Sequence, residues 1–173
     1  IALEDEARAA TQAPLTTLDF DWGSGGLGQW EFLSEQVEIK NGGLLFKVPS
    51  RGAGTFELKT PLQLPVDVSY SVRVTTRGLG RNGVLWTTLG PAPGEGFASF
   101  GGATLYRLRG GGSDYLAGRR KPQALFAGRR HKVRIHFGRE LTEGWVDDKL
   151  LFSHATDAQL GPLRLAFRLE RGV

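Results

Sequence analysis

The stretch of residues 132–154, KVRIHFGRELTEGWVDDKLLFSH, constrains the fold more than any other part of this chain. Val133, Ile135 and Phe137 alternate with polar residues, a period of two that is typical of a half-buried β-strand. The rest of the stretch predicts a turn over 138–140, a strand over 141–146, a tight turn over 147–148 and a strand over 149–154. The sequence therefore predicts a three-strand antiparallel meander.

Short segments of the same character recur along most of the chain. They predict strands over 15–20, 30–33, 37–40, 44–48, 55–58, 67–76, 84–89, 97–100, 104–108 and 163–169. Asn41-Gly42 is a strong hairpin-turn signal. Residues 114–128 carry no such pattern, so we expect them to be irregular. Many short strands with turns between them predict an all-β antiparallel sandwich of jelly-roll type.

The N-terminal 14 residues are the only segment of helical character, because they are rich in alanine and end at Pro14. We interpret 1–14 as a short helix, a linker or the stub of a removed segment, and 15–173 as one β-sandwich domain. A removed segment could have been a signal peptide, an anchor helix or another domain. No run of 18 apolar residues predicts a transmembrane span in this chain.

Composition excludes some chemistry. The chain has no cysteine, which rules out disulfides and thiolate catalysis. It also has no methionine, few asparagines and more arginine than lysine, a composition that fits a thermophile or a high-GC genome. We expect a bacterial protein that is secreted or belongs to the cell envelope.

Charge is unevenly distributed around a formal net charge of +4. Residues 107–134 carry nine basic side chains against Asp114 alone, whereas residues 1–40 carry eight acidic side chains against two basic ones. This asymmetry favours an anionic partner. An alternative is that the arginines only keep a glycine-rich β protein soluble and protect its edge strands.

Three sets of residues resemble the concanavalin A-like lectin/glucanase jelly roll, in particular laminin-G-like and family-16-related domains. The first set is Leu18-Asp19-Phe20-Asp21, followed by Trp30 and by residues 37–44. The second set is residues 66–67, which open a long strand, and residues 81–86, which lead into the next strand. The third set is residues 131–135, followed by residues 144–147 and 160–162. The resemblance covers residues 15–169. It implies the fold, and it implies a weak calcium site near Asp19, Asp21 or Asp157; we otherwise expect no cofactor.

Catalytic motifs are missing. Family-16-type glucanases carry an E-x-D-x-x-E strand, and this chain has none. Glu95 and Asp114 read as solvated loop acids. His131, His136 and His154 are scattered, match no zinc-site spacing, and are expected on the surface. The sequence therefore predicts no enzyme and, apart from the weak possibility of calcium, no metal centre.

Ligand binding is easier to argue, because aromatic faces stack on sugar rings and arginine holds carboxylate or sulfate. The predicted ligand-binding residues are Trp86, Tyr106, Arg107, Arg109, Tyr115, Arg119, Arg120 and Trp145. Core packing is the competing interpretation for both tryptophans.

The predicted function is a non-catalytic carbohydrate-binding or surface-interaction module for an acidic glycan or other polyanion. One alternative is a structural or assembly module of a bacterial envelope complex or filament, anchored by a removed N-terminal segment and bound to a protein partner. A second alternative is a degenerate or unrecognised glycoside hydrolase. Nucleic acid would bind only non-specifically, since no recognition fold for it is apparent.

Overall fold

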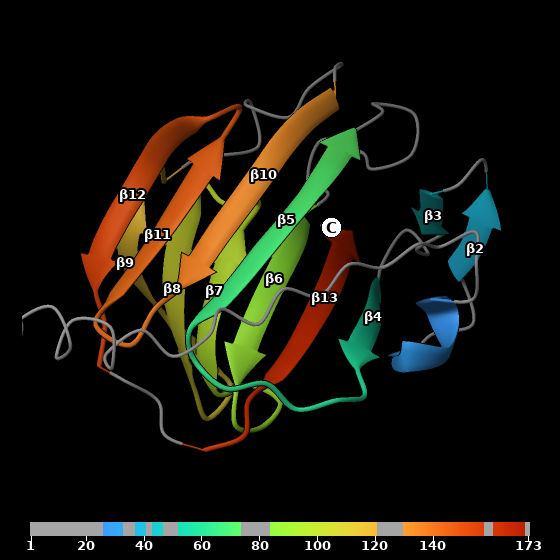
Figure 1. Ribbon diagram of the computed structural model, residues 1–173, viewed down its shortest axis with the longest axis horizontal. Helices are drawn as coiled ribbons and strands as arrows, with labels where there is room; N and C mark the ends of the chain where they lie inside the picture. The colour runs from blue at the N-terminus through green and yellow to red at the C-terminus, as the bar shows by residue number, and fades with distance from the viewer. Residues whose placement is uncertain are drawn as a thin grey trace, which may run out of the picture.

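A computed structural model describes residues 26–32, 37–40, 43–46, 52–73, 84–120, 130–157 and 161–171. These residues form a short 3-10 helix, Gly26–Gln29, and thirteen β-strands (Figure 1). The strands are β1 (Trp30–Phe32), β2 (Val37–Lys40), β3 (Gly43–Phe46), β4 (Gly52–Leu58), β5 (Val66–Arg73), β6 (Val84–Gly90), β7 (Gly96–Phe100), β8 (Thr104–Arg109), β9 (Gly112–Gly118), β10 (Arg130–Phe137), β11 (Leu141–Val146), β12 (Lys149–Ala155) and β13 (Arg164–Arg171).

Two antiparallel sheets form the two layers of the molecule. One has seven strands in the order β1-β4-β13-β6-β7-β8-β9, and the other has four in the order β12-β11-β10-β5. Figure 1 shows the four-stranded sheet in front of the seven-stranded one, with the β2–β3 hairpin at one side. Both sheets pair strands that are distant in sequence, as a jelly roll requires. The predicted β-sandwich is confirmed.

The core lies between the two sheets and follows from the alternation in β10. Val133, Ile135 and Phe137 are buried there, together with apolar side chains of the seven-stranded sheet. The fully buried Thr87 of β6 has its hydroxyl 3.1 Å from the Tyr70 hydroxyl of β5, so this hydrogen bond joins the sheets. Burial raises the pKa of Tyr70 to about 12, and the Thr87 hydrogen bond opposes that rise. One face of each sheet is thereby assigned to the interior.

The predicted meander is confirmed as β10-β11-β12. Its second turn places Asp147 at φ 50° and Asp148 at φ 62°, the left-handed pair of a type I′ hairpin turn. The Asp147 carboxylate accepts a hydrogen bond of 3.0 Å from the backbone N–H of Lys132. That contact ties the turn to the neighbouring strand.

The prediction that residue 114 onward is irregular is wrong for the segment that forms β9. A turn at Gly110 and Gly111, with φ of 52° and 90°, joins β8 to β9 as a hairpin. Period-two patterning missed this strand because β9 is an edge strand whose first half is exposed, so it needs no apolar alternation. Residues 121–129 lie outside the described part of the chain.

The expectation of a surface position is also wrong for His131, which is only 3% exposed. Its place in β10 is on the inward-facing side, and its Nδ1 lies 2.8 Å from Oδ2 of Asp147. His136 and His154 are half-buried. The N-terminal segment 1–14, the strand predicted over 15–20 and the Asn41-Gly42 turn all lie outside the described residues. No helix in the described ranges is long and apolar enough to cross a membrane.

Candidate ligand-binding surfaces

An aromatic row crosses the outer face of the seven-stranded sheet. Thr87 points into the sandwich, so its neighbour Trp86 must point outward, because successive side chains of a strand alternate between faces. The strand register puts Trp86 of β6 opposite Phe100 of β7, and Tyr106 of β8 opposite Tyr115 of β9. We call Trp86, Tyr106 and Tyr115 the aromatic row.

The three rings of the aromatic row touch in succession. The ring centroids of Trp86 and Tyr106 are 5.3 Å apart and those of Tyr106 and Tyr115 are 5.8 Å apart, both at interplanar angles of 78°. Tyr106 lies opposite Ala98 in the register, and this small side chain on the intervening β7 leaves room for the Trp86 contact. Edge-to-face pairs of this kind hold aromatic side chains in fixed orientations. The row is therefore a preorganised set of rings, of which Tyr115 is exposed and Trp86 and Tyr106 are half-buried.

Backbone features at the end of β9 position Tyr115. Its hydroxyl donates a hydrogen bond of 2.6 Å to the Gly118 carbonyl. Gly118 has φ of 98°, and a Cβ there would overlap the Ala103 carbonyl, so the position requires glycine. The Arg120 guanidinium then lies 4.9 Å from the centroid of the Tyr115 ring. Tyr115 itself is 38% exposed, so an exposed ring and a cation stand together at this end of the row.

The other predicted arginines of this segment lie elsewhere. Arg107 projects from the opposite side of β8 to Tyr106, 5.8 Å from the Phe97 ring centroid and 3.6 Å from the Asp157 carboxylate. Arg109 and Arg119 are exposed, and among the cation–π contacts of the described residues none joins either side chain to the aromatic row. Of the four predicted arginines, the structure therefore places only Arg120 against the aromatic row.

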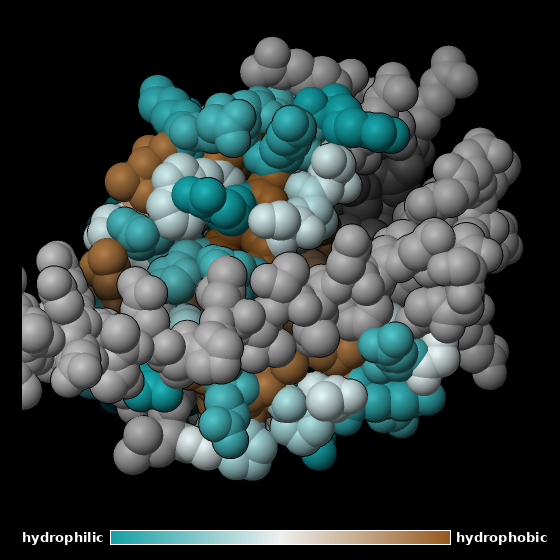
Figure 2. Space-filling model, in the orientation of Figure 1, coloured by the Kyte–Doolittle hydropathy of each residue, from teal (hydrophilic) through white to brown (hydrophobic). Residues whose placement is uncertain are grey.

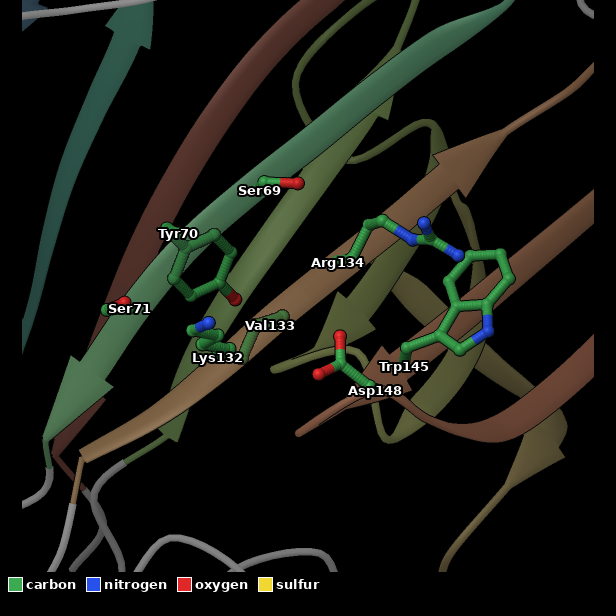
Figure 3. A pocket seen from close by; sticks show the side chains of 8 residues that line it. All are labelled: Ser69, Tyr70, Ser71, Lys132, Val133, Arg134, Trp145 and Asp148. Carbon is green, nitrogen blue, oxygen red and sulfur yellow. The ribbon is translucent and has the colours of Figure 1, made fainter.

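Trp145 lies on the outer face of the other sheet. In β11 it pairs with Arg134 of β10, whose guanidinium stands 3.9 Å from the centroid of the indole (Figure 3). Trp145 is half-buried. Trp86 is half-buried too, but it packs against the core, with its ring centroid 5.7 Å from that of the buried Phe100, so core packing accounts for part of its contacts. A shallow depression of about 300 Å³ adjoins the pair. Its lining consists of Ser69, Tyr70, Ser71, Lys132, Val133, Arg134, Trp145 and Asp148.

Sequence reasoning did not select Ser69, Ser71, Lys132 or Arg134 as binding residues. The signal was present, because Lys132 and Arg134 occupy alternate positions of the best-defined strand and must share its outer face. Nearness in sequence, which relates the predicted binding residues, separates Trp145 from Arg134, the cation that lies over its ring.

The weak calcium site expected near Asp19, Asp21 or Asp157 stays a prediction. Asp157 is paired with Arg107, and Asp19 and Asp21 lie outside the described residues. Across the described ranges, no three histidine or acidic side chains are grouped as metal ligands. His136 contacts Asp67 instead, at 2.8 Å between Nδ1 and Oδ1. The chemistry available at both outer faces is stacking, hydrogen bonding and charge.

Comparison with solved structures places this architecture. The VIP36 exoplasmic/lumenal domain, in its Ca²⁺/Man-bound form, matches with a TM-score of 0.67 at 12% identity, over 88% of this chain and 82% of that one. The carbohydrate-binding module CBM66 from Bacillus subtilis matches with a TM-score of 0.56 at 12% identity, over 83% and 92%. The Crh5 transglycosylase in complex with NAG matches with a TM-score of 0.60 at 17% identity, over 88% and 68%.

The fold is a concanavalin A-like jelly roll. The predicted resemblance is thus confirmed at the level of fold. No family model matches the sequence, and no curated protein matches it. Function must therefore be argued from the two outer faces of the jelly roll, because this fold supports both binding and catalysis.

Proposed function

We propose that this chain is a non-catalytic carbohydrate-binding module whose ligand lies on the aromatic row of the seven-stranded sheet. The observation that carries the proposal is the continuous contact of Trp86, Tyr106 and Tyr115 on one outward face. Sugar rings present apolar C–H faces that pack on aromatic side chains, and rings already fixed in position lose little entropy on binding. Of the similar structures, the VIP36 domain is a mannose-bound form and CBM66 is a carbohydrate-binding module.

We further propose that the ligand is an acidic glycan, with Arg120 as its charge-reading residue. The guanidinium stands 4.9 Å from the Tyr115 ring centroid, so a sugar packed at this end of the row would bring a carboxylate within its reach. Arg107 has no role in this proposal, because its side chain projects from the interior side of β8, where it pairs with Asp157 and lies against the Phe97 ring. The aromatic row supplies affinity, and Arg120 supplies selectivity for charge.

The test is a glycan array at physiological salt that includes neutral, uronate-rich and sulfated glycans. The wild-type protein is compared with Tyr115→Ala, and with Tyr115→Phe as the matched control that keeps the ring. Binding to a defined glycan that Tyr115→Ala removes and Tyr115→Phe retains is the expected result. A blank array, or binding that Tyr115→Ala leaves intact, would overturn the proposal.

The remaining sequence predictions stay predictions. These are a secreted or bacterial-envelope location, a thermophilic source, and the two alternative functions of envelope assembly and degenerate glycoside hydrolysis. A glycosidase neighbour is represented by the Crh5 transglycosylase, yet the E-x-D-x-x-E strand is absent from this sequence. An array hit without turnover of the bound oligosaccharide would separate binding from hydrolysis.

A further inference from the structure

A row of three cations runs along the outer face of β10. Arg130, Lys132 and Arg134 are all exposed, and the residues between them point into the sandwich. Alternate residues of a strand lie about 6.6 Å apart, so the three charges are evenly spaced along one line. We call these three residues the basic row. Figure 2, which views the molecule from the side of this sheet, shows mainly hydrophilic side chains over the upper part of that face.

The basic row is not neutralised by its neighbours. Within the described residues, no carboxylate forms an ion pair with any of its three members. Asp67 is engaged by His136, and Asp147 by His131 and by a backbone N–H. Among the described residues that line the depression, Asp148 is the one acidic side chain. Asp67 and Glu143 also lie on this outer face, but both are opposite His136, so the positive charge is concentrated at the other end of β10.

The depression beside the basic row is equipped to hold an anionic group. The strand register places Ser71 opposite Lys132 and Ser69 opposite Arg134, so each cation has a hydroxyl beside it on β5. On the other side, Trp145 stacks with the Arg134 guanidinium at 3.9 Å (Figure 3). Stacking fixes the plane of the guanidinium and leaves its N–H groups free to bind an anion in the plane. A volume of about 300 Å³ is at the small end of the range for small-ligand sites.

We propose that the outer face of the four-stranded sheet is a second binding site, and that its ligand is a linear anionic polysaccharide, sulfated or carboxylated. Arg134 and Lys132 bind the anionic group of one sugar unit in the depression, with Ser69 and Ser71 as hydroxyl partners. Arg130 contacts a charge further along the polymer. The site is independent of the aromatic row, since the two lie on different sheets and face away from each other.

A nucleic acid fits this face less well than a polysaccharide does. Single strands bind to sheets chiefly by stacking bases on exposed aromatic rings. The only aromatic side chain among the outward-facing residues of the depression is Trp145, and Arg134 already lies over its ring. Charge alone would remain, and charge alone discriminates poorly between polymers.

The test is calorimetric titration of the full chain at physiological salt with four probes: heparin, polygalacturonate, neutral dextran and poly(dT). The variants are Arg134→Gln and Lys132→Gln, with Arg139→Gln as the matched control that removes an exposed cation outside the site. Arg134→Lys keeps the charge but removes the planar, stacked guanidinium. Thermal unfolding of each variant verifies that the fold is retained.

We expect heparin or polygalacturonate to bind, dextran not to bind, and Arg134→Gln to weaken binding by about tenfold, the loss of one charge-assisted hydrogen bond. Arg139→Gln should leave the affinity within about twofold, because a rim charge contributes little. Which of the two acidic polymers binds better identifies sulfate or carboxylate as the anion. Binding that persists in Tyr115→Ala would show that this site works without the aromatic row.

Three results would overturn the inference. The first is equal loss in Arg134→Gln and Arg139→Gln, which would mean unspecific attraction to net charge. The second is binding that Tyr115→Ala removes and Arg134→Gln retains, which would assign the polymer to the other face. The third is tighter binding of poly(dT) than of either polysaccharide with the same sensitivity to Arg134→Gln.

Discussion

The two outer faces of this sandwich use the same strand geometry for different chemistry. On the seven-stranded sheet, Trp86, Tyr106 and Tyr115 contact one another across the strands and carry one cation at their end. On the four-stranded sheet, cations run along a single strand and Trp145 stands beside them. The register between strands decides which side chains line up across a sheet, whereas the alternation of side chains along one strand decides which of its residues share a face. The comparison shows how one fold presents an apolar and a charged surface without disturbing its core.

A β-bulge lies next to the key aromatic residues on both faces. The register shifts between Leu105 and Tyr106 of β8, and again between Gly144 and Trp145 of β11. A bulge inserts one unpaired residue and redirects the side chains that follow it, which is why bulges are common near functional sites. In both places the unpaired residue lies on the edge strand: Leu116 of β9, next to Tyr115, and Leu151 of β12, across from Trp145. Each shift therefore sets which side chain of the edge strand lies opposite the aromatic residue of its neighbour.

The largest expected effect is at the centre of the aromatic row. Tyr106→Ala removes the ring that contacts both Trp86 and Tyr115, so we expect the affinity for a bound oligosaccharide to fall by about 2 kcal/mol, the loss typical of a central hot-spot residue. The affinity is measured by calorimetry with an oligosaccharide identified on the array, and Tyr106→Phe is the control. An unchanged affinity in Tyr106→Ala would show that the aromatic row is not the binding site of the oligosaccharide.

The next largest effect is expected at Trp145, on the outer face of the four-stranded sheet. Trp145→Ala leaves every cation in place but removes the ring under Arg134, and we expect about 1 kcal/mol weaker binding of an acidic polysaccharide, the size of a cation–π contact. Trp145→Phe keeps an aromatic ring under Arg134 and should therefore retain much of the affinity for the acidic polysaccharide. Binding to the aromatic row should not change. If Trp145→Ala instead weakens oligosaccharide binding at the aromatic row, the two faces are coupled and the comparison fails.

Substitutions of Arg120 and Arg107 should differ in their effect on the preference for acidic oligosaccharides. Arg120→Gln is expected to reduce the preference for an acidic over a neutral oligosaccharide by about fivefold, a partly exposed charge contact. Arg107→Gln should leave the preference unchanged, because that side chain projects from the other side of β8 and pairs with Asp157. Competition binding with a matched pair of uronate and neutral sugars measures both. Equal effects would show that net charge, not position, sets the preference.

The smallest effect concerns the core that separates the two faces. The pKa of Tyr70 rises from 10.0 to about 12 because burial disfavours the phenolate. A pKa that is higher in the folded state contributes stability that is fully present below pH 10 and is lost as the pH rises toward 12. Tyr70→Phe should therefore unfold with a weaker pH dependence between pH 10 and 12 in urea titrations. An identical pH dependence would show that Tyr70 is not the titrating group.

Much of the fold could be predicted from the sequence. The alternation of Val133, Ile135 and Phe137 set the interior face of β10, and Asp147-Asp148 set the turn that aligns the next two strands. Strand β9 is not recognisable from the pattern, because an exposed edge strand with Asp114 and two glycines shows no apolar period. Such a strand is recognisable only once its partner is known.

The candidate site was predictable in part. The sequence identified Tyr106, Tyr115 and Arg120, which the structure brings together, but it grouped Arg107 with them although alternation sends that residue to the opposite side. The contact of Trp86 with Tyr106 depends on register between strands that no local pattern encodes. The bulges could not be foreseen either, since a one-residue shift in pairing leaves no compositional signal.

Chemical-shift mapping on the ¹⁵N-labelled chain, with each ligand in turn, shows directly which face of the sandwich each ligand contacts. With an oligosaccharide from the array, we expect the shifted amides to cluster on β6, β8 and β9. With an acidic polysaccharide fragment, we expect them to cluster on β10 and β5. Shifts from both ligands on one and the same sheet would contradict the assignment of separate binding surfaces to the two faces of the sandwich.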